Sequence, residues 1–322
     1  MTVLALAVAC AGLACGQQLD ARSADSASPV RVLVEPDVGP DAVRALLAGA
    51  QRALSLEMYL LTDAATLEVL GARRAAGVDV RILLEPHPYQ ADGANQAAFD
   101  QLAAAGVDVR WTSPQFALTH AKVAVIDHAR LAVLTLNLTR AGLAGNREYA
   151  VIDDDPRDVA AADALLAADA TGLPVAAPGA GRVLASPETT RPALAAALER
   201  ARSVVAVETE ELSDPALVGA LADARARGCA VSIALPGSGA SAATTGAARR
   251  LAAAGVVVRL VDAPQIHAKA VVADDWLYVG SANLTAASLD ANREVGLGLR
   301  DPAALALVAG TIADDLARGR SP

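Results

Sequence analysis

Two histidine–lysine pairs carry the residue types in this sequence that could perform nucleophilic and acid–base chemistry. Lys122 stands two positions after His120, and Lys269 stands two positions after His267. No other lysine occurs among the 322 residues, so the remaining 25 of the 27 basic residues (27 − 2) are arginines. A lysine offers a compact ammonium that suits a crowded oxyanion, whereas an arginine offers a planar fork. We therefore interpret both pairs as parts of a reactive site.

The surroundings of the two pairs are also repeated. Residues 102–107 and residues 251–256 both read LAAAGV, and the two histidines are 147 positions apart (267 − 120). Further upstream, the segments around Glu57 and Glu208 align with each other. A repeat of roughly 150 residues has the size of a compact domain. The predicted organisation is a leader (1–29), a first domain (30–170), a linker (171–181) and a second domain (182–322).

Each half alternates short Val- and Leu-rich runs with Ala-rich helical stretches, and such alternation indicates an α/β layer architecture. We therefore predict two similar α/β domains. The strands predicted in the first half are Arg31–Val34, Leu54–Tyr59, Val80–Leu84, Val107–Trp111, Lys122–Ile126, Leu131–Leu134 and Tyr149–Ile152. The predicted helices are Asp41–Ala53, Ala64–Ala76, Ala94–Ala105 and Arg157–Ala168, and Pro302–Arg318 ends the second half.

The composition argues against some classes of partner. Hydrophobic residues make up 54% of the chain and aromatic residues only 2%, which disfavours a stacking platform for single-stranded nucleic acid. The net charge is −9, whereas binding to a DNA or RNA backbone usually needs a basic surface. We therefore expect nucleic acid less than other partners, although a local basic cleft would escape this argument.

The N-terminal segment has the pattern of an export signal. Residues 2–14 form an uncharged apolar run that is too short to span a bilayer, and the polar stretch Gly16–Ser28 follows it. The alternative is a buried N-terminal helix. Cys15 resembles a bacterial lipoprotein cysteine, with Cys10 as the weaker candidate, so we predict an exported protein, periplasmic or on the cell surface, with a lipid anchor at Cys15. Cys229 then remains alone, and we interpret it as a small buried hydrophobe.

Further polar residues recur at matched spacing after each pair. The first copy supplies Asp127, Thr135, Asn137 and Glu148, and the second copy supplies Asp274, Ser281, Asn283 and Glu294. The pattern resembles the signature of the phospholipase D superfamily, His-x-Lys-(x)4-Asp followed by Gly-Ser-x-Asn and a later acidic residue, present twice. The resemblance covers nearly the whole chain after the leader. It implies two halves related by a pseudo-two-fold axis, with both His-x-Lys loops at one central cleft.

The chemistry of phosphodiester cleavage explains these residue types. The reaction needs a nucleophile, a proton for the leaving alkoxide and cations around the non-bridging oxygens, and two histidines and two lysines supply all three without a metal or a cofactor. A carboxylate such as Glu148 can accept a hydrogen bond from one ring nitrogen of His120 and leave the other free to attack. The resemblance implies that His120 forms a phosphohistidine and that His267 is the acid, while the sequence alone leaves their order open.

The other matched residues have supporting roles in this hypothesis. The amides of Asn137 and Asn283 can donate to the phosphate. The hydroxyls of Thr135 and Ser281 are predicted to support them there, and Glu294 is the catalytic counterpart of Glu148. Two aspartates begin turns after strands, so we interpret them as structural: Asp127 and Asp274.

One departure from the family pattern bears on activity. Leu134 stands where the family usually has glycine, and Thr135 replaces serine. We expect Thr135 to keep the hydroxyl, whereas Leu134 could crowd the backbone near the phosphate. A catalytically inactive binding module is therefore an alternative reading of this chain.

The favoured function is that of a phosphoric diester hydrolase of phospholipase D type. Export beside a membrane favours a phospholipid as substrate, cleaved by hydrolysis or transfer through a phosphohistidine, and a lipid anchor would bring the membrane surface close. The alternatives are an exported nuclease-like phosphodiesterase and a cardiolipin-synthase-like phosphatidyltransferase.

Overall fold

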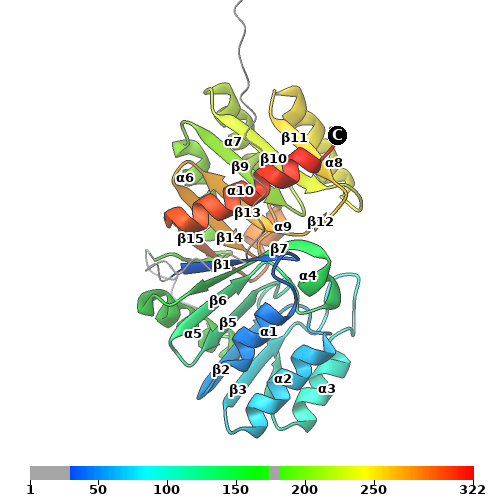
Figure 1. Cartoon of the computed structure of the whole chain (residues 1–322), viewed down its shortest axis with the longest axis vertical. Coiled ribbons are helices and arrows are strands. Elements are labelled where there is room, and N and C mark those ends of the chain that lie inside the picture. Colours follow the sequence, from blue (N-terminus) through cyan, green and yellow to red (C-terminus); the bar gives the residue numbers. More distant parts are fainter. Residues whose placement is uncertain (1–29, 174–180) are drawn as a thin grey trace, which may run out of the picture.

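The computed structural model describes residues 30–173 and 181–322. Within them the two halves lie one above the other along the long axis of the molecule (Figure 1). The predicted leader, with Cys10 and Cys15, lies outside the described residues, as do residues 174–180 of the predicted linker.

Each half is built on a mixed sheet with helices on its faces. The first sheet has the order β1-β7-β6-β5-β2-β3-β4, and the second has the order β11-β10-β9-β13-β14-β15-β8. Read from opposite ends, the two orders correspond strand by strand, which confirms the predicted fold class of two similar α/β domains. The strands of the first half are β1 (Val30–Glu35), β2 (Ala53–Met58), β3 (Asp79–Leu84), β4 (Asp108–Trp111), β5 (Lys122–Ile126), β6 (Arg130–Leu134) and β7 (Asn146–Asp153). Those of the second half are β8 (Val183–Ser186), β9 (Val204–Thr209), β10 (Ala230–Pro236), β11 (Val257–Val261), β12 (Gln265–Ile266), β13 (Lys269–Ala273), β14 (Trp276–Gly280) and β15 (Glu294–Leu299).

The helices follow the predicted order with small differences. The first predicted helix ends at Ala48, because residues 53–58 already belong to β2. Two short helices were not predicted, since five residues give too little periodicity; each is capped by a threonine hydroxyl that accepts from a backbone N–H three residues on. The helices are α1 (Asp41–Ala48), α2 (Ala64–Ala75), α3 (Gln96–Ala104), α4 (Arg140–Ala144), α5 (Pro156–Thr171), α6 (Thr190–Arg200), α7 (Pro215–Ala226), α8 (Ala242–Ala253), α9 (Ala286–Asp290) and α10 (Pro302–Arg318).

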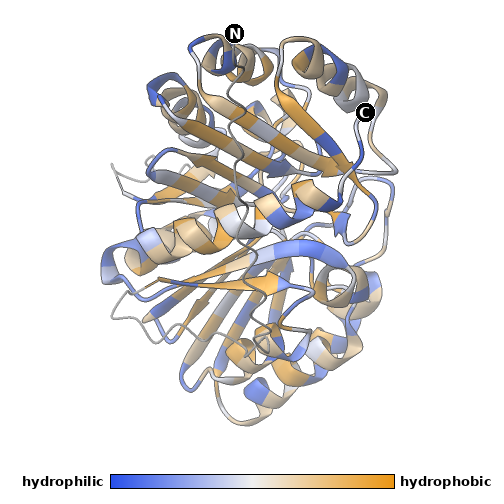
Figure 2. Cartoon of the chain, turned by 45° about the horizontal axis from the view of Figure 1, so that its top comes forward, coloured by the Kyte–Doolittle hydropathy of each residue, from blue (hydrophilic) through white to orange (hydrophobic). Residues whose placement is uncertain are grey.

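A hydrophobic core runs through both halves without a break. The strands are largely hydrophobic (Figure 2), and one buried cluster joins β5 and β6 of the first half to β13, β14 and β15 of the second. Its members include Val123, Val133, Ala270, Val279 and Leu297. Helix α5 packs on β2, β5 and β6, and α10 packs on the second sheet and reaches β1. A shared apolar core of this kind favours a fixed arrangement of the halves over a hinge.

Leu134 belongs to a hydrophobic cluster of the first half and not to a phosphate site. It is 1% exposed and lies in a core cluster with Ala132 and Ala150. At the matched place in the second half, a Cβ on Gly280 would lie 2.5 Å from the Tyr278 hydroxyl. In the second half the large Tyr278 ring therefore packs beside Gly280. In the first half the larger Leu134 packs beside the smaller Ala132 and Ala150, so the total side-chain volume is similar in both halves. The expectation that Leu134 crowds the backbone near the phosphate is therefore wrong.

Two buried arginines tie each half to the last helix of the other. Arg147 at the start of β7 binds Asp315 of α10, with Nε 2.6 Å from Oδ2. Arg293, just before β15, binds Asp169 of α5, with Nε 2.9 Å from Oδ2. Both arginines are at most 2% exposed. Buried guanidinium groups need such partners, because a charge left unpaired in the core is strongly destabilising.

We expect Asp315→Ala to lower the free energy of unfolding by about 3–5 kcal/mol, because it leaves the Arg147 charge buried without its main partner. Urea unfolding followed by circular dichroism measures the change. Asp314→Ala is the matched control, since Asp314 is the exposed neighbour on the same helix, and it should change stability by less than about 0.5 kcal/mol. Equal effects of the two variants would contradict an anchoring role for the Arg147–Asp315 pair.

Candidate active site

Each histidine–lysine pair lies where a loop enters a central strand. Lys122 is the first residue of β5, and Lys269 is the first residue of β13. Each ammonium turns back to its own histidine: Lys122 Nζ donates to the carbonyl of His120 at 2.7 Å, and Lys269 Nζ donates to that of His267 at 2.5 Å. The lysines are at most 1% exposed. Burying an ammonium is costly, which indicates a function other than stability.

The backbone ahead of each histidine pairs with the opposite half. Thr119 bridges Arg293, and the His120 N–H donates to the Arg293 carbonyl at 2.8 Å. In the same way β12 pairs with β7, and the His267 N–H donates to the Arg147 carbonyl at 3.3 Å. Each histidine therefore lies beside the Asn-Arg-Glu triplet of the other copy.

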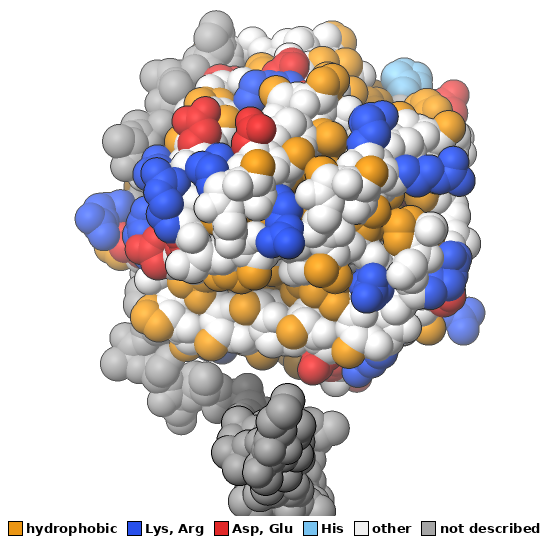
Figure 3. Space-filling model, turned by 90° about the horizontal axis from the view of Figure 1, so that it is seen from above, with side chains coloured by type: hydrophobic (Ala, Val, Ile, Leu, Met, Phe, Trp, Pro, Cys, Tyr) orange, Lys and Arg blue, Asp and Glu red, His pale blue; other side chains and the backbone are white. Residues whose placement is uncertain are grey.

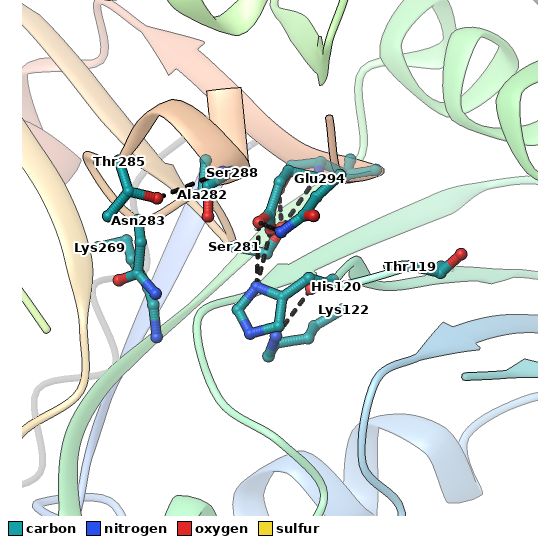
Figure 4. Close-up of polar contacts among 12 residues, drawn as sticks. Thr119, His120, Lys122, Lys269, Ser281, Ala282, Asn283, Thr285, Ser288 and Glu294 are labelled. Carbon is teal, nitrogen blue, oxygen red and sulfur yellow. Dashed lines mark hydrogen bonds and ion pairs between the residues drawn. The ribbon is translucent and has the colours of Figure 1, made fainter. Parts of the chain in front are cut away.

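This pairing exchanges the two glutamates between the halves. Nδ1 of His120 donates to Oε2 of Glu294 at 2.9 Å (Figure 4). Nδ1 of His267 lies 2.6 Å from Oε1 of Glu148. The expectation that Glu148 holds His120 is therefore wrong. Spacing within one copy suggested that partner, but the backbone contacts across the halves select the other.

Both carboxylates stay ionised although they are fully buried. Burial would raise the pKa of Glu294, but the charges of His120 and Lys122 outweigh it and lower that pKa below its ordinary value. Burial would likewise raise the pKa of Glu148, but His267 and Lys269 outweigh it, and that pKa is also lower than its ordinary value. Each glutamate can thus fix the orientation and the tautomer of its histidine.

The cations of the first half are easier to deprotonate than usual. Burial lowers the pKa of His120 below its ordinary value, against the opposing effect of Glu294. Burial, and then the charge of Lys269, lower the pKa of Lys122 to about 7. His120 therefore gives up its proton, and frees its Nε2 lone pair, more easily than an ordinary histidine. Among residues 30–173 and 181–322, its Nε2 has no hydrogen-bond partner.

The amides and hydroxyls divide into two groups. Asn137 and Asn283 are 8% and 9% exposed, and the side-chain oxygen of Asn137 has no partner within the described part of the chain. Thr135 and Ser281, predicted at the phosphate, are fully buried behind the carboxylates. Thr135 donates to Glu148 Oε2 at 2.6 Å, and Ser281 Oγ accepts the N–H of residue 295 at 3.0 Å. The structure thus places these hydroxyls where they position glutamates and strands.

The motif aspartates lie at the far ends of the strands. Asp127 follows β5 and accepts the backbone N–H groups of residues 51–53. Asp274 follows β13 and accepts those of residues 202–204. Each joins its central strand to the loop before the antiparallel neighbour, β2 or β9, and touches neither His120 nor His267.

Two residues at the site were missed by the sequence analysis. The ring of Tyr59 stands edge-on to His120, with centroids 4.5 Å apart. Glu210 Oε2 lies 2.9 Å from Lys269 Nζ. The repeat carried a signal, because Tyr59 and Glu210 both stand two positions after the aligned Glu57 and Glu208. Their different chemistry hid the correspondence.

Within the described ranges, no group of three or more His, Cys, Asp or Glu side chains has the arrangement of a metal site. No helix there is long and apolar enough to cross a bilayer.

Comparison with known families agrees with this geometry. A family model described as "Cardiolipin synthase, PLD-like domain" matches residues 43–169 and again residues 194–315. The chain belongs to the phospholipase D superfamily. Enzymes of this superfamily act on phosphodiesters, and the two matches, one in each half, fit the duplicated site. No curated protein sequence matches the chain at a significant level.

The solved structures that resemble the chain include the following two. Phosphatidylserine synthase from Haemophilus influenzae is 15% identical with a TM-score of 0.67, over 91% of this chain and 87% of that one. Polyphosphate kinase from Porphyromonas gingivalis is also 15% identical, with a TM-score of 0.71 over 89% of this chain. The chain spans about half the length of that kinase, 50%. At this identity the likeness shows the fold alone.

The two lysines allow a direct measurement of the site's electrostatics. In protein labelled with ¹³Cε-lysine, two resonances are expected, and Lys122→Arg assigns them by removing one. We expect the Lys122 signal to titrate near pH 7, because burial and Lys269 lower its pKa to about 7. Titration of that signal near the ordinary lysine value of about 10.4 would contradict the buried, charge-crowded site.

Proposed function

We propose that the chain cleaves a phosphodiester of a phospholipid through a phosphohistidine on His120, with His267 as the acid. The observation that carries the proposal is the exchanged pairing. Two histidines meet at the boundary between the halves, each backed by a buried carboxylate from the opposite half. Their side chains are 12% and 17% exposed, which leaves both accessible to a substrate.

The steps balance with the groups present. Nε2 of His120 attacks phosphorus, and a P–N bond forms as the P–O bond to the leaving alcohol breaks. His267 gives its proton to that departing oxygen. Water or a second alcohol then attacks phosphorus, its proton passes to His267, and the P–N bond breaks. The ammonium groups of Lys122 and Lys269 stabilise the charge on the non-bridging oxygens.

The surroundings of the two rings support this order of roles. A nucleophile needs a free lone pair, and Nε2 of His120 meets no partner within the described ranges. Nε2 of His267 instead lies 3.4 Å from Glu210 Oε2. A hydrogen on that nitrogen is favoured by the carboxylate, which suits a group that must donate a proton.

Several observations favour phospholipid over nucleic acid. The chain has a net charge of −9 and few aromatic residues. On the outer end of the second half, basic side chains lie among hydrophobic and acidic ones and form no continuous band (Figure 3). The predicted export signal at residues 2–14 and lipid anchor at Cys15 would hold the enzyme beside a membrane.

Transfer to an alcohol is the second candidate. The matching family model is named for cardiolipin synthase, and the similar Haemophilus influenzae protein is a phosphatidylserine synthase. Hydrolysis and transfer share the phosphohistidine and differ only in the group that attacks it. An inactive binding module has less support, because Leu134 packs in the core.

The two histidines should respond differently to the leaving group. We expect His120→Ala to abolish covalent labelling by a ³²P-labelled diester and all turnover. His267→Ala should lose about 10²–10⁴-fold in kcat with an alkyl leaving group, and a p-nitrophenyl leaving group should partly restore the rate because it needs no proton. Restoration in the His120 variant, with none in the His267 variant, would reverse the assigned roles.

The substrate class can be tested with purified protein in the presence of EDTA. We expect release of headgroup from phosphatidylcholine or cardiolipin vesicles, with added glycerol revealing transfer, and little nicking of plasmid DNA. Chelator should leave the rate unchanged, because side chains supply every catalytic group. Cleavage of DNA alone would reject the lipid substrate, and loss of activity restored by a divalent ion would reject the mechanism.

A further inference from the structure

Glu210 occupies the place where a phosphate oxygen would be expected. Its Oε2 atom lies 2.9 Å from Lys269 Nζ, 3.4 Å from His267 Nε2 and 3.4 Å from the amide nitrogen of Asn283. Of these three donors, Lys269 and Asn283 are assigned to the phosphate, and His267 is assigned to the leaving oxygen. One carboxylate oxygen thus contacts three donors of the second half, and Figure 4 shows Lys269 and Asn283 on the same side of His120.

The first half shows that such a carboxylate is not needed to hold a lysine. Tyr59 stands at the matched position, and its ring, not an anion, lies over Lys122 with Nζ 5.0 Å from the centroid. Lys122 nevertheless turns back to its own histidine carbonyl at 2.7 Å, as Lys269 does. Across residues 30–173 and 181–322, no carboxylate lies within ion-pair distance of Lys122. Glu210 is therefore an addition that is specific to the second half.

The carboxylate is charged and can leave. Burial would raise the pKa of Glu210, but the charges of Lys269 and His267 outweigh it and hold the pKa far below its usual range. Its side chain is 34% exposed, so rotation toward solvent is open. With Glu210 in place, three ionised carboxylates face two ammonium groups, and the Lys122 ammonium has a pKa of about 7.

We propose that Glu210 is an internal anion that occupies the phosphate-binding donors of the second half until a substrate phosphate displaces it. Its charge makes the site favour a phosphodiester with one negative charge over a phosphomonoester with two. Either ligand must break the same contacts of Glu210 with Lys269, His267 and Asn283 in order to bind. The carboxylate that remains nearby repels a dianionic monoester more strongly than a monoanionic diester, because the Coulomb energy grows with the ligand charge. This inference rests on the proposed function in one respect, that the anion that displaces Glu210 is a phosphate ester.

The test compares two ligands that differ by one methyl group and one charge. Methyl phosphate is largely dianionic at pH 7, since the second pKa of a phosphate monoester is about 6, whereas dimethyl phosphate carries one charge. Calorimetric titration of the whole chain gives both dissociation constants. We expect Glu210→Gln to tighten methyl phosphate by about tenfold, or about 1.4 kcal/mol, and dimethyl phosphate by about threefold or less.

The neighbouring residue provides the matched control. Glu211→Gln removes the same charge one position along, from a side chain that makes no ion pair with either lysine in the described structure, and should change both constants less than about twofold. Glu210→Ala is a second variant that should tighten methyl phosphate at least as much as Glu210→Gln.

Two results would overturn the proposal: methyl phosphate binding to both Glu210 variants no more tightly than to the parent, or equal gains for the two ligands. The proposed function has a separate measurement, the turnover of a diester. A chain that binds as expected but cleaves nothing would reject that function and leave the role of Glu210 intact.

Discussion

The active site depends on one constraint, which is the backbone pairing of each histidine segment with the opposite half. Thr119 bridges Arg293, and β12 pairs with residues 146–147 at the start of β7. These contacts fix the register between halves, so that each imidazole meets the glutamate of the other copy. Neither half supplies both the catalytic imidazole and the buried glutamate that contacts its Nδ1. The catalytic arrangement is therefore a property of the interface, and the continuous hydrophobic core keeps that interface closed.

The Asn-Arg-Glu triplets join stability to chemistry within two consecutive residues. Because successive side chains of a strand point to opposite faces, Arg147 turns to Asp315 while Glu148 turns to His267. Arg293 and Glu294 divide the same tasks in the second half. A shift of one residue in either strand would bury a carboxylate where the guanidinium belongs. The ion pairs therefore help to hold the register that the histidines need.

The sequence predicted the repeated α/β fold, the order of strands and helices, and the histidines and lysines, because these depend on periodicity and residue type. It did not predict the exchange of Glu148 and Glu294, since spacing along one copy carries no information about contacts across an interface. The effect of Leu134 was also beyond the sequence alone, because its fit depends on Ala132 of the same strand and on Ala150 of the neighbouring strand β7. Thr135 was placed at the phosphate because hydroxyls suit that role, but its burial directs it to Glu148 instead.

The matched positions of Tyr59 and Glu210 show what covalent fusion permits. An assembly of two identical subunits would carry either two tyrosines or two glutamates there, because two-fold symmetry repeats every substitution on both sides. A single chain that contains both copies is free of that restriction. One imidazole can rest against an aromatic edge while its twin faces an anion. Gene duplication thus gave a symmetric scaffold the freedom to assign unequal tasks to residues that began as equals.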